Sequence, residues 1–283
     1  MARDGISGRS RVYGILGDPV DHSASPAMQN AALAAAGLDA VYVPFHVRPA
    51  DLPAAVEGLR AAGVAGLNVT VPHKEAVVVL LDELRPRARA CGAVNTIVRT
   101  RRGLAGDNTD GAGFLAALAE AGYRVRGADV LLIGAGGSAR SLAHALVRAG
   151  CGSLLIANRT PARARALVRT LASGRAAADG LEALRDRPGL GGFGLIVNCT
   201  STGLRKTAPP LLFTATRPDA LCCDLLYGRT PAPFLRRARA AGRRTMDGRG
   251  MLLHQGALAF ELWTGRPAPL AAMRRALGRV LRR

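Results

Sequence analysis

The sequence predicts an α/β protein folded into two lobes. Short apolar, β-branched runs alternate with Ala-, Leu- and Arg-rich stretches of helical period, which is the pattern of βαβ units around a parallel sheet. A chain of 283 residues is also long enough for one large or two medium domains with cores of their own. A Gly/Asp/Asn-rich segment at residues 106–111 interrupts the alternation, and we expect a domain boundary near residues 103–113, with a cleft between the two lobes.

The expected strands are the apolar and β-branched runs at residues 12–16, 41–45, 66–71, 130–133, 154–157, 195–198 and 221–224. The expected helices lie between them, at residues 26–36, 49–62, 111–121, 138–149 and 161–172. Proline opens the helices at Pro26 and Pro161, where its missing N–H is tolerated. This order places one α/β lobe before the 103–113 segment and a second lobe after it.

The chain is strongly basic, with 39 Lys and Arg against 20 Asp and Glu and a formal net charge of +19. Together with 49% hydrophobic residues, this composition excludes a disordered tail, a fibrous repeat and a disulfide scaffold. The arginines are scattered along helix-like segments and aromatic residues make up only 4%, so we expect solvated helix faces and no nucleic-acid partner. The positive field would still attract a phosphorylated or carboxylate ligand.

Five cysteines, at positions 91, 151, 199, 222 and 223, form no C-x-x-C pair, and no His pair has metal-ligand spacing. We interpret these cysteines as buried reduced thiols and expect no bound metal. Residues 1–9 hold no apolar run after their charges, and no later stretch reaches the roughly 18 apolar residues of a membrane span. The sequence therefore predicts a soluble, cytoplasmic protein.

A glycine-rich turn joins the expected strand at 130–133 to the helix that follows it. Its sequence from Gly134 to Ala139, Gly-Ala-Gly-Gly-Ser-Ala, fits the G-x-G-x-x-A pattern of dinucleotide-binding loops. Gly134 permits the tight turn, while Gly136 and Gly137 let the backbone approach a pyrophosphate that the helix N-terminus then binds. We predict dinucleotide binding here, against the alternative of a tight turn alone.

The end of the next strand indicates which dinucleotide binds. NAD-binding units place Asp or Glu there to hold the ribose hydroxyls, but this chain has Asn158, Arg159 and Thr160, with Arg163 close behind. Two guanidinium groups can pair with a 2′-phosphate, so the segment favours NADP(H). The alternative is that Asn158 and Thr160 only turn the chain and cap the helix that Pro161 opens.

Two serines precede the first expected helix. Ser23 and Ser25 stand two residues apart, just before Pro26, and can direct hydroxyl groups toward a ligand carboxylate while the helix N-terminus adds its dipole. N-capping alone would explain a single serine at such a place, but it explains two less well. The pair therefore indicates an anion site in the first lobe.

Lysine is rare in this chain: Lys74 and Lys206 are two of the 39 cationic residues, and the other 37 (39 − 2) are Arg. Lys74 suggests chemistry that needs an ammonium able to give up a proton, which Arg cannot do at neutral pH. Asp110 leads into a helix, where N-capping is one interpretation. Across the cleft from Lys74, Asp110 would instead form a carboxylate–ammonium pair that shares a transferable proton.

Nine short motifs, in order along nearly the whole chain, resemble the shikimate dehydrogenase family. They are Ser23-x-Ser25-Pro, Asn68-Val-Thr-Val-Pro-His-Lys74, Gly92-Ala-Val-Asn95-Thr, Asn108-Thr-Asp110-Gly, Gly134-Ala-Gly-Gly-Ser-Ala-Arg140, Asn158-Arg-Thr160, Asn198-Cys-Thr-Ser-Thr-Gly203, Asp224-Leu-Leu-Tyr227 and Gly250-Met-Leu-Leu-His-Gln255. The resemblance implies an NADP-dependent oxidoreductase of aromatic amino-acid (chorismate) biosynthesis, a monomer or homodimer. Such an enzyme reversibly reduces the C3 carbonyl of 3-dehydroshikimate to the CH–OH group of shikimate.

The resemblance also implies how the work divides between the lobes. Residues 1–110, completed by C-terminal helices at 250–283, would bind the substrate and catalyse, and residues 111–249 would form a Rossmann-type, doubly wound NADP-binding domain. The cofactor would supply a hydride, and Lys74 would deliver a proton to the forming alkoxide. Asp110 would relay that proton or balance its charge.

Each residue that matches a motif receives a role from the family. Ser23 and Ser25 would hold the substrate carboxylate with Thr70 near them, Asn95, Asp110 and Gln255 would bind ring hydroxyls, and Lys74 and Asp110, also in contact with the substrate, would form the catalytic pair. The residues implied to hold the cofactor are Gly134, Ala135, Gly136, Gly137, Ser138, Asn158, Arg159, Thr160 and Arg163. Thr200 and Thr202 would line its nicotinamide side, and Tyr227, toward the substrate, and Gly248, toward the cofactor, would border the ring.

Three residues, in two places along the chain, depart from the family's pattern. Gln29 stands where a histidine is usual, a change that bears on helix packing more than on chemistry. Arg205 and Lys206 stand where small residues are more usual, and they either affect cofactor affinity or are only surface charges.

Three alternatives for the function stay open. Quinate/shikimate and aminoshikimate dehydrogenases share nearly all of these motifs, although the segment from Asn158 to Arg163 argues against the NAD-preferring quinate members. From a different class, the scaffold could serve as a ligand-sensing regulator that has lost catalysis. Intact Lys74 and Asp110 argue against that loss.

Overall fold

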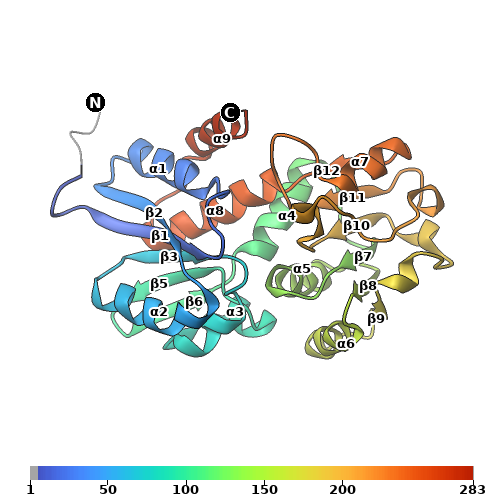
Figure 1. Ribbon diagram of the computed structural model, residues 1–283, viewed down its shortest axis with the longest axis horizontal. Helices are drawn as coiled ribbons and strands as arrows, with labels where there is room; N and C mark the ends of the chain where they lie inside the picture. Colours follow the sequence, from blue (N-terminus) through green and yellow to red (C-terminus); the bar gives the residue numbers. More distant parts are fainter. Residues whose placement is uncertain (1–5, 283) are drawn as a thin grey trace. The chain divides into compact units, whose positions relative to one another are not determined.

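The computed structural model describes residues 6–282, except the side chains of Leu204 and Arg205. The chain divides into two compact units, one built from residues up to Gly113 and from Leu252 onward, the other from Phe114 to Met251. The chain passes from the first unit to the second within α4 (Asp110–Glu120) and returns within α8 (Arg249–Thr264) (Figure 1).

The first unit contains a six-stranded mixed sheet. Its strands lie in the order β2 (Ala40–His46), β1 (Arg11–Gly17), β3 (Gly66–Val69), β5 (Thr96–Thr100), β6 (Gly103–Asp107) and β4 (Glu83–Leu84). β1 pairs in parallel with β2 and β3, as the βαβ pattern predicts, but β5 is antiparallel to both β3 and β6. The two residues between β5 and β6 leave no room for the crossover helix that parallel pairing requires, so this part of the sheet is a hairpin.

The segment that the sequence indicates as a domain boundary begins as a buried strand. Residues 103–107 form β6, and Leu104 and Ala105 are buried within it. This strand is not among those expected from the sequence, whereas the division between the units falls at Gly113, within the expected boundary segment. The strand forms because β5 and β4 flank it and bond its backbone, although its own sequence contains no β-branched residue.

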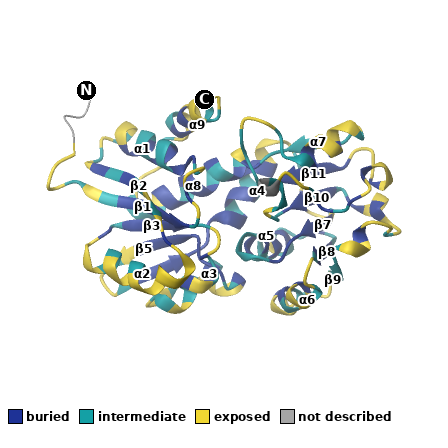
Figure 2. Cartoon of the chain, viewed as in Figure 1, coloured by how far each residue is buried: buried dark blue, intermediate teal, exposed yellow. Residues whose placement is uncertain are grey.

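Helices cover both faces of this sheet. On one face, α2 (Leu52–Ala61), the 3-10 helix η2 (Ala76–Leu80) and α3 (Pro86–Cys91) share a core with Leu16 and Leu67. On the other, α1 (Ser25–Ala35) packs against α9 (Leu270–Val280), and α8 lies beside them (Figure 1). Figure 2 shows the strands buried and the outer helix faces exposed. Segments from the two ends of the sequence, α1 and α9, thus pack together in the first unit.

The helix expected at residues 49–62 is two elements. A 3-10 turn, η1, spans Pro49–Asp51, and the α-helix α2 starts only at Leu52. The cause is Pro53, which has no N–H to donate to the carbonyl of Pro49, so that carbonyl accepts from Leu52 instead. The other predicted helices are confirmed with bounds that differ by one or two residues.

Trp263, the single tryptophan, fixes α8 against the sheet. Its indole N–H donates to the carbonyl of Ile97 at 2.9 Å, and its ring lies 5.3 Å from that of Tyr13 and 6.0 Å from that of Tyr42. We expect Trp263→Phe to keep these ring contacts but to lose the indole hydrogen bond, lowering the free energy of unfolding by about 0.5–1.5 kcal/mol. Urea unfolding followed by circular dichroism measures this loss, and an unchanged midpoint would mean that the bond contributes nothing.

The second unit contains a six-stranded sheet in which every pairing is parallel. Its order is β12 (Arg244–Met246), β11 (Leu221–Asp224), β10 (Leu195–Asn198), β7 (Asp129–Ile133), β8 (Ser153–Asn158) and β9 (Ala176–Gly180). The chain runs from β7 outward to β9, then returns to β10 and runs outward the other way to β12, so the strand order reverses beside β7. This doubly wound topology confirms the predicted fold class.

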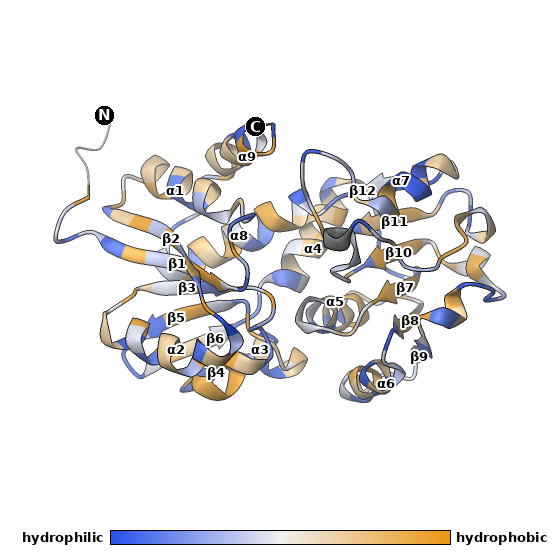
Figure 3. Ribbon diagram, in the orientation of Figure 1, coloured by the Kyte–Doolittle hydropathy of each residue, from blue (hydrophilic) through white to orange (hydrophobic). Residues whose placement is uncertain are grey.

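Both faces of the second sheet are buried. Val130 and Leu132 of β7 join the core under α4, α5 (Gly137–Arg148) and α6 (Pro161–Thr170), and Leu131 and Ile133 join the core under α7 (Pro233–Ala240). The short helices η3 (Glu182–Leu184), η4 (Leu190–Gly192) and η6 (Phe213–Ala215) also pack on this second face. Figure 3 shows the resulting hydrophobic strands. Burial on both sides explains why β7, β10 and β11 are uninterrupted apolar runs.

Among the helices that the structure describes, none has the length and apolar character that crossing a bilayer requires. The first five residues of the N-terminal segment considered above lie outside the described residues.

Candidate active site

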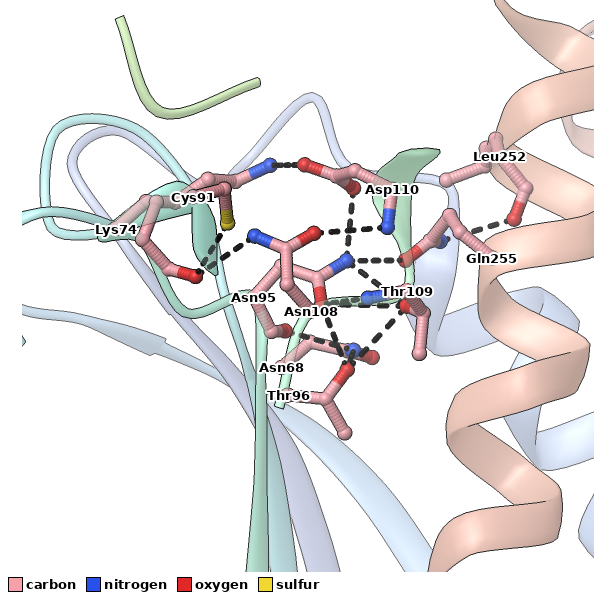
Figure 4. A network of polar contacts seen from close by, with 11 residues as sticks. Asn68, Lys74, Cys91, Asn95, Thr96, Asn108, Thr109, Asp110, Leu252 and Gln255 are labelled. Carbon is pink, nitrogen blue, oxygen red and sulfur yellow. Dashed lines mark hydrogen bonds and ion pairs between the residues drawn. The ribbon is translucent and has the colours of Figure 1, made fainter. Parts of the chain in front are cut away.

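A lysine–aspartate ion pair lies in the first unit. The Nζ atom of Lys74 lies 2.5 Å from Oδ2 of Asp110, and the two side chains are 12% and 4% exposed (Figure 4). Lys74 follows β3, and Asp110 is the first residue of α4. The expectation that these two residues face each other across the gap between lobes is wrong, because both belong to the same unit. The pair itself forms as the residue types predict.

Asp110 is oriented by its neighbours. The side-chain oxygen of Asn108 accepts from the Asp110 N–H at 3.1 Å and so begins the helix. Both carboxylate oxygens of Asp110 are bonded, Oδ2 to Lys74 and Oδ1 to the amide of Asn95 at 2.7 Å. The helix N-terminus also favours a negative charge there. This arrangement holds an ionised carboxylate against an ammonium group.

Asn95 and Gln255 complete the polar cluster. The amide nitrogen of Asn95 donates to Oε1 of Gln255 at 3.2 Å, and the amide of Gln255 donates to the carbonyl of Leu252 at 2.9 Å (Figure 4). Asn95 comes from the turn before β5, and Gln255 comes from α8, 160 residues further along the chain. The structure thus brings together Lys74, Asp110, Asn95 and Gln255, all of which the family pattern selects.

A second layer of polar residues supports this cluster, and sequence reasoning assigned it no role. Asn68 of β3 accepts a 2.7 Å bond from the hydroxyl of Tyr42 and donates to the carbonyl of Asn95 at 3.1 Å. Thr109 donates its N–H to Oδ1 of Asn95 at 2.8 Å and accepts from its amide at 2.9 Å. The sequence did hold one signal: a polar Asn68 inside an apolar strand is unusual unless it has a buried partner.

A buried carboxylate anchors the turn that precedes α4. Asp107, 2% exposed at the end of β6, accepts two bonds from Arg87, at 3.0 and 2.8 Å. The Asp107 carboxylate raises the pKa of the Arg87 guanidinium, mainly through these bonds. Asp107 also accepts from the N–H of Asn108, whose side chain bonds the first N–H of α4. The ion pair therefore fixes the turn that positions Asp110.

The two serines lie at the start of α1. Ser25 is its first residue and is 4% exposed, and Ser23 accepts from the Ser25 N–H at 3.2 Å. The N-cap position belongs to Ala24, and Ser23 bonds the first N–H of α1, so the capping alternative explains Ser23 in part and does not explain Ser25, which lies inside the helix. Thr70, half-buried, follows β3, whose parallel neighbour β1 precedes the serine loop.

Gln29 confirms its packing role. It is 1% exposed on α1, and its amide nitrogen donates to the carbonyl of Gly256 on α8 at 2.9 Å. The bond ties the helix that follows the serines to the residue after Gln255.

In the second unit, the glycine-rich turn links β7 to α5. Gly134 has a φ of +116°, a conformation that favours glycine, and a Cβ there would lie 3.3 Å from the backbone of Cys199. Gly136 occupies the N-cap of α5 with open space beside it, and among the described residues no side chain caps this helix. The N-terminus of α5, with its backbone dipole, is suited to binding a phosphate, and Ala135, Gly137 and Ser138 line the same turn.

The end of β8 has the expected positive character. Arg159, Thr160 and Arg163 are exposed there, and Asn158 holds the turn by donating to the carbonyl of Thr160 at 2.9 Å. Thr160 occupies the N-cap of α6 but makes no side-chain cap bond. The capping alternative thus explains Asn158 in part and explains neither arginine.

One carboxylate lies on the neighbouring strand. Asp179 of β9 pairs in register with Ala157, and its carboxylate is bonded to Arg187. That ion pair offsets the nearby negative charge, so the residues present fit a 2′-phosphate.

The remaining residues of the second unit lie beyond β10 and β11. Thr200 and Thr202 share a 2.8 Å hydroxyl bond, at the start of the 3-10 helix η5 (Thr202–Arg205). Tyr227 lines a pocket of about 400 Å³ together with Lys206, which is exposed, while the side chain of Arg205 lies outside the described residues. Gly248 lies directly against the carbonyl of Leu225, so a side chain there would clash. Backbone packing alone thus explains the glycine at position 248.

A doubly wound unit with an open, glycine-bounded helix N-terminus, joined to a second α/β unit that holds a lysine–aspartate pair, defines a class: the two-domain nicotinamide-dependent dehydrogenases. Family models match three segments of the chain. They are the shikimate dehydrogenase substrate binding domain at residues 15–97, shikimate / quinate 5-dehydrogenase at residues 117–202 and the shikimate 5'-dehydrogenase C-terminal domain at residues 248–277. The chain belongs to the shikimate dehydrogenase family.

Individual relatives agree with this assignment. The chain is 48% identical to a shikimate dehydrogenase (NADP(+)) of Moorella thermoacetica, over 96% of this chain and 94% of the relative. The structure of shikimate 5-dehydrogenase from Thermus thermophilus in complex with NADP(H) and shikimate is similar with a TM-score of 0.84, 39% identity and coverage of 96% and 100%. Quinate dehydrogenase from Corynebacterium glutamicum in complex with NAD is also similar, with a TM-score of 0.84, 30% identity and coverage of 94% and 98%.

Proposed function

We propose that this chain is an NADP-dependent shikimate dehydrogenase that reversibly reduces 3-dehydroshikimate to shikimate. The observation that carries the proposal is the buried 2.5 Å pair between Lys74 and Asp110, with the amides of Asn95 and Gln255 beside it. An ammonium group held by a carboxylate can give a proton to an oxygen and recover it. Side-chain amides can both donate to and accept from neighbouring ring hydroxyls.

The two units then divide the work. We assign substrate binding and proton transfer to residues 1–110 with 250–283, because the ion pair and the serine loop both lie there. We assign NADP binding to residues 111–249, because the glycine turn and the arginines that follow β8 lie there.

Reduction of a carbonyl group needs one hydride and one proton. NADPH supplies the hydride when it is bound. Lys74 gives a proton from Nζ to the oxygen that forms at C3, and in the reverse direction it accepts the proton of that hydroxyl. Asp110 keeps Lys74 in place through Oδ2 and balances its charge, while the Asn95 amide fixes the carboxylate through Oδ1.

The serine loop provides the binding of the substrate carboxylate. Ser23 and Ser25 lie at the N-terminus of α1, which favours an anion through its backbone N–H groups and its dipole. Thr70 adds a third hydroxyl, and Asn95 and Gln255 bind the ring hydroxyls. The carboxylate and the hydroxyls together would orient the ring so that its C3 oxygen meets Lys74.

In the cofactor site, backbone groups would bind the pyrophosphate, and side chains would bind the adenosine and nicotinamide ends of NADP(H). The turn from Gly134 to Ser138 binds the pyrophosphate, and Asn158, Arg159, Thr160 and Arg163 hold the adenosine side with its 2′-phosphate. Thr200, Thr202 and Gly248 would border the nicotinamide, and Tyr227 would border the substrate. A cytoplasmic location is part of the proposal, supported by five cysteines that are all free thiols.

Kinetics with shikimate, quinate and aminoshikimate, each with NADP+ and NAD+, test the proposal. We expect the highest kcat/KM for shikimate with NADP+, and a preference for NADP+ over NAD+ of at least about tenfold, because charge-assisted bonds to the 2′-phosphate contribute about 1.5–3 kcal/mol each. A higher kcat/KM for quinate or aminoshikimate would identify the corresponding alternative. Absence of turnover, with salt-dependent binding of duplex DNA, would favour the regulator.

A further inference from the structure

A buried chain of polar groups crosses the second unit where β10 and β11 end. Asp224, the last residue of β11, is 1% exposed, and Asn198, the last residue of β10, is 0% exposed. The two residues are partners in the register of these parallel strands. The family pattern gives Thr200 and Tyr227 roles nearby, but it leaves Asp224 and Asn198 without one.

In this series of hydrogen bonds, Thr200 donates to Asn198 and Asn198 donates to Asp224. The Asn198 amide nitrogen donates to Oδ2 of Asp224 at 2.9 Å, and its oxygen accepts from the N–H of Thr200 at 3.1 Å and from its hydroxyl at 2.7 Å. The Thr200 hydroxyl also lies 2.8 Å from that of Thr202. The other oxygen of Asp224 accepts from the Leu226 N–H at 3.0 Å.

The carboxylate determines which way the Asn198 amide points. Because a carboxylate only accepts, the amide nitrogen of Asn198 must face Asp224, and the amide oxygen must then face Thr200. In an Asp224→Asn variant, the new amide oxygen would accept from the Leu226 N–H. Its NH2 group would then face the NH2 group of Asn198. One N–H group in the chain would then be left without an acceptor.

A carboxylate at this place is costly, which argues for a specific use. Burial, to which the negative charge of Asp247 adds, raises the pKa of Asp224 to about 6. No cation among the described residues forms an ion pair with Asp224. Asparagine would fill the same volume without that cost, so packing alone does not explain the acid.

The loops that follow β10 and β11 both lead to residues of the proposed cofactor site. The loop after β10 lies against the glycine turn, since the Cys199 N–H donates to the carbonyl of Ile133 at 2.8 Å. The loop after β11 lies against Gly248, whose N–H donates to the carbonyl of Leu226 at 3.0 Å. Asp224 therefore joins the loop that carries Thr200 and Thr202 to the loop that carries Tyr227.

We propose that Asp224 and Asn198 are positioning residues that hold the two loops of the second unit in the arrangement that binds the nicotinamide end of NADP(H). The inference rests on the proposed function. It assigns no contact with the cofactor to either residue. Their action is indirect, through the hydroxyls of Thr200 and Thr202.

The test compares Asp224→Asn, Asn198→Asp and the reciprocal double variant, with NADPH binding measured by its fluorescence and shikimate KM measured by turnover. We expect Asp224→Asn to raise the Kd for NADPH by about 5- to 100-fold, as expected for one orphaned bond, and to change shikimate KM less than twofold. Asn198→Asp places two carboxylates together and should bind NADPH more weakly still. The double variant can rebuild every bond, because the amide introduced at position 224 can donate to the carboxylate introduced at position 198, and it should bind within about threefold of the unchanged chain.

Asp219→Asn is the matched control, because Asp219 is an exposed acid of the same unit paired with Arg217, and its Kd should not change. An Asp224→Asn variant that binds NADPH like the unchanged chain would overturn the inference, and so would a folded double variant that stays weak. If Asp224→Asn does not fold, recovery of binding in the double variant still supports the inference. If the unchanged chain bound no NADPH, the proposed function would fail and this inference with it, whereas the other failures concern the inference alone.

Discussion

Replacing Lys74 by alanine is expected to lower kcat by about 10²- to 10⁴-fold, the usual contribution of a general acid. Lys74 holds the amine that can deliver the proton, 2.5 Å from the carboxylate that positions it. The KM for shikimate should change much less, because the serines, Asn95 and Gln255 remain to bind the ring. The measurement is steady-state kinetics in both directions, with NADPH binding as a check that the second unit is unchanged.

Lys74→Arg is the informative control. Arginine keeps the positive charge beside Asp110 but does not give up its proton at neutral pH. If proton transfer is the role of Lys74, this variant should be nearly as slow as Lys74→Ala. If charge alone is needed, it should recover most of the rate, and near-normal turnover in either variant would refute the general-acid assignment.

The second sheet was largely predictable from the sequence, and the first was only partly so. β7, β8, β10 and β11 are buried on both faces, so each is an apolar run that stands out by itself. β5, with Thr96, Ile97 and Val98, also has the residues of a strand, but β6 has none of them. β6 exists through pairing with its neighbours, and pairing of that kind is not visible in a local pattern.

In the active site, too, residue types were predictable from the sequence, whereas contacts between distant residues were not. The types of Lys74 and Asp110 indicated an acid–base pair, and the structure places them in contact. The expectation that a cleft separates them was wrong, because both lie in the unit built from residues up to Gly113 and from Leu252 onward. The supporting bonds of Asn68 were missed for a different reason: its partner Tyr42 lies 26 residues earlier on another strand. Register between strands, and not residue type, creates that contact.

The structure shows that the arginines of this basic chain have different environments. Many of the arginines, such as Arg217 and Arg249, form ion pairs with nearby acids at exposed or half-exposed positions. Such surface pairs contribute little to stability. Arg87 is different, because it bonds the buried Asp107 that fixes the turn before Asp110. The net charge alone therefore said little about function, and the environment of each arginine says more.

Replacing both Arg159 and Arg163 by alanine is expected to weaken NADP+ binding by about 10²- to 10⁴-fold while leaving NAD+ binding within about twofold. Each guanidinium can form charge-assisted bonds with the 2′-phosphate, and such bonds contribute about 1.5–3 kcal/mol each. NAD+ has no 2′-phosphate, so it loses nothing at this position. Titration calorimetry with both cofactors at fixed ionic strength measures the change in preference.

Arg165→Ala gives the matched control, because Arg165 is an exposed arginine of the same helix, α6, outside the family's motif. If the general positive field attracts the cofactor, Arg165→Ala should weaken NADP+ binding as much as a single change at Arg159 or Arg163. High salt should then remove the effect of each of these changes. If a specific site binds the 2′-phosphate, only the changes at Arg159 and Arg163 should alter the ratio of NADP+ to NAD+ affinity. Equal weakening of both cofactors by the double variant would contradict the phosphate assignment and return Asn158 and Thr160 to the role of turning the chain into α6.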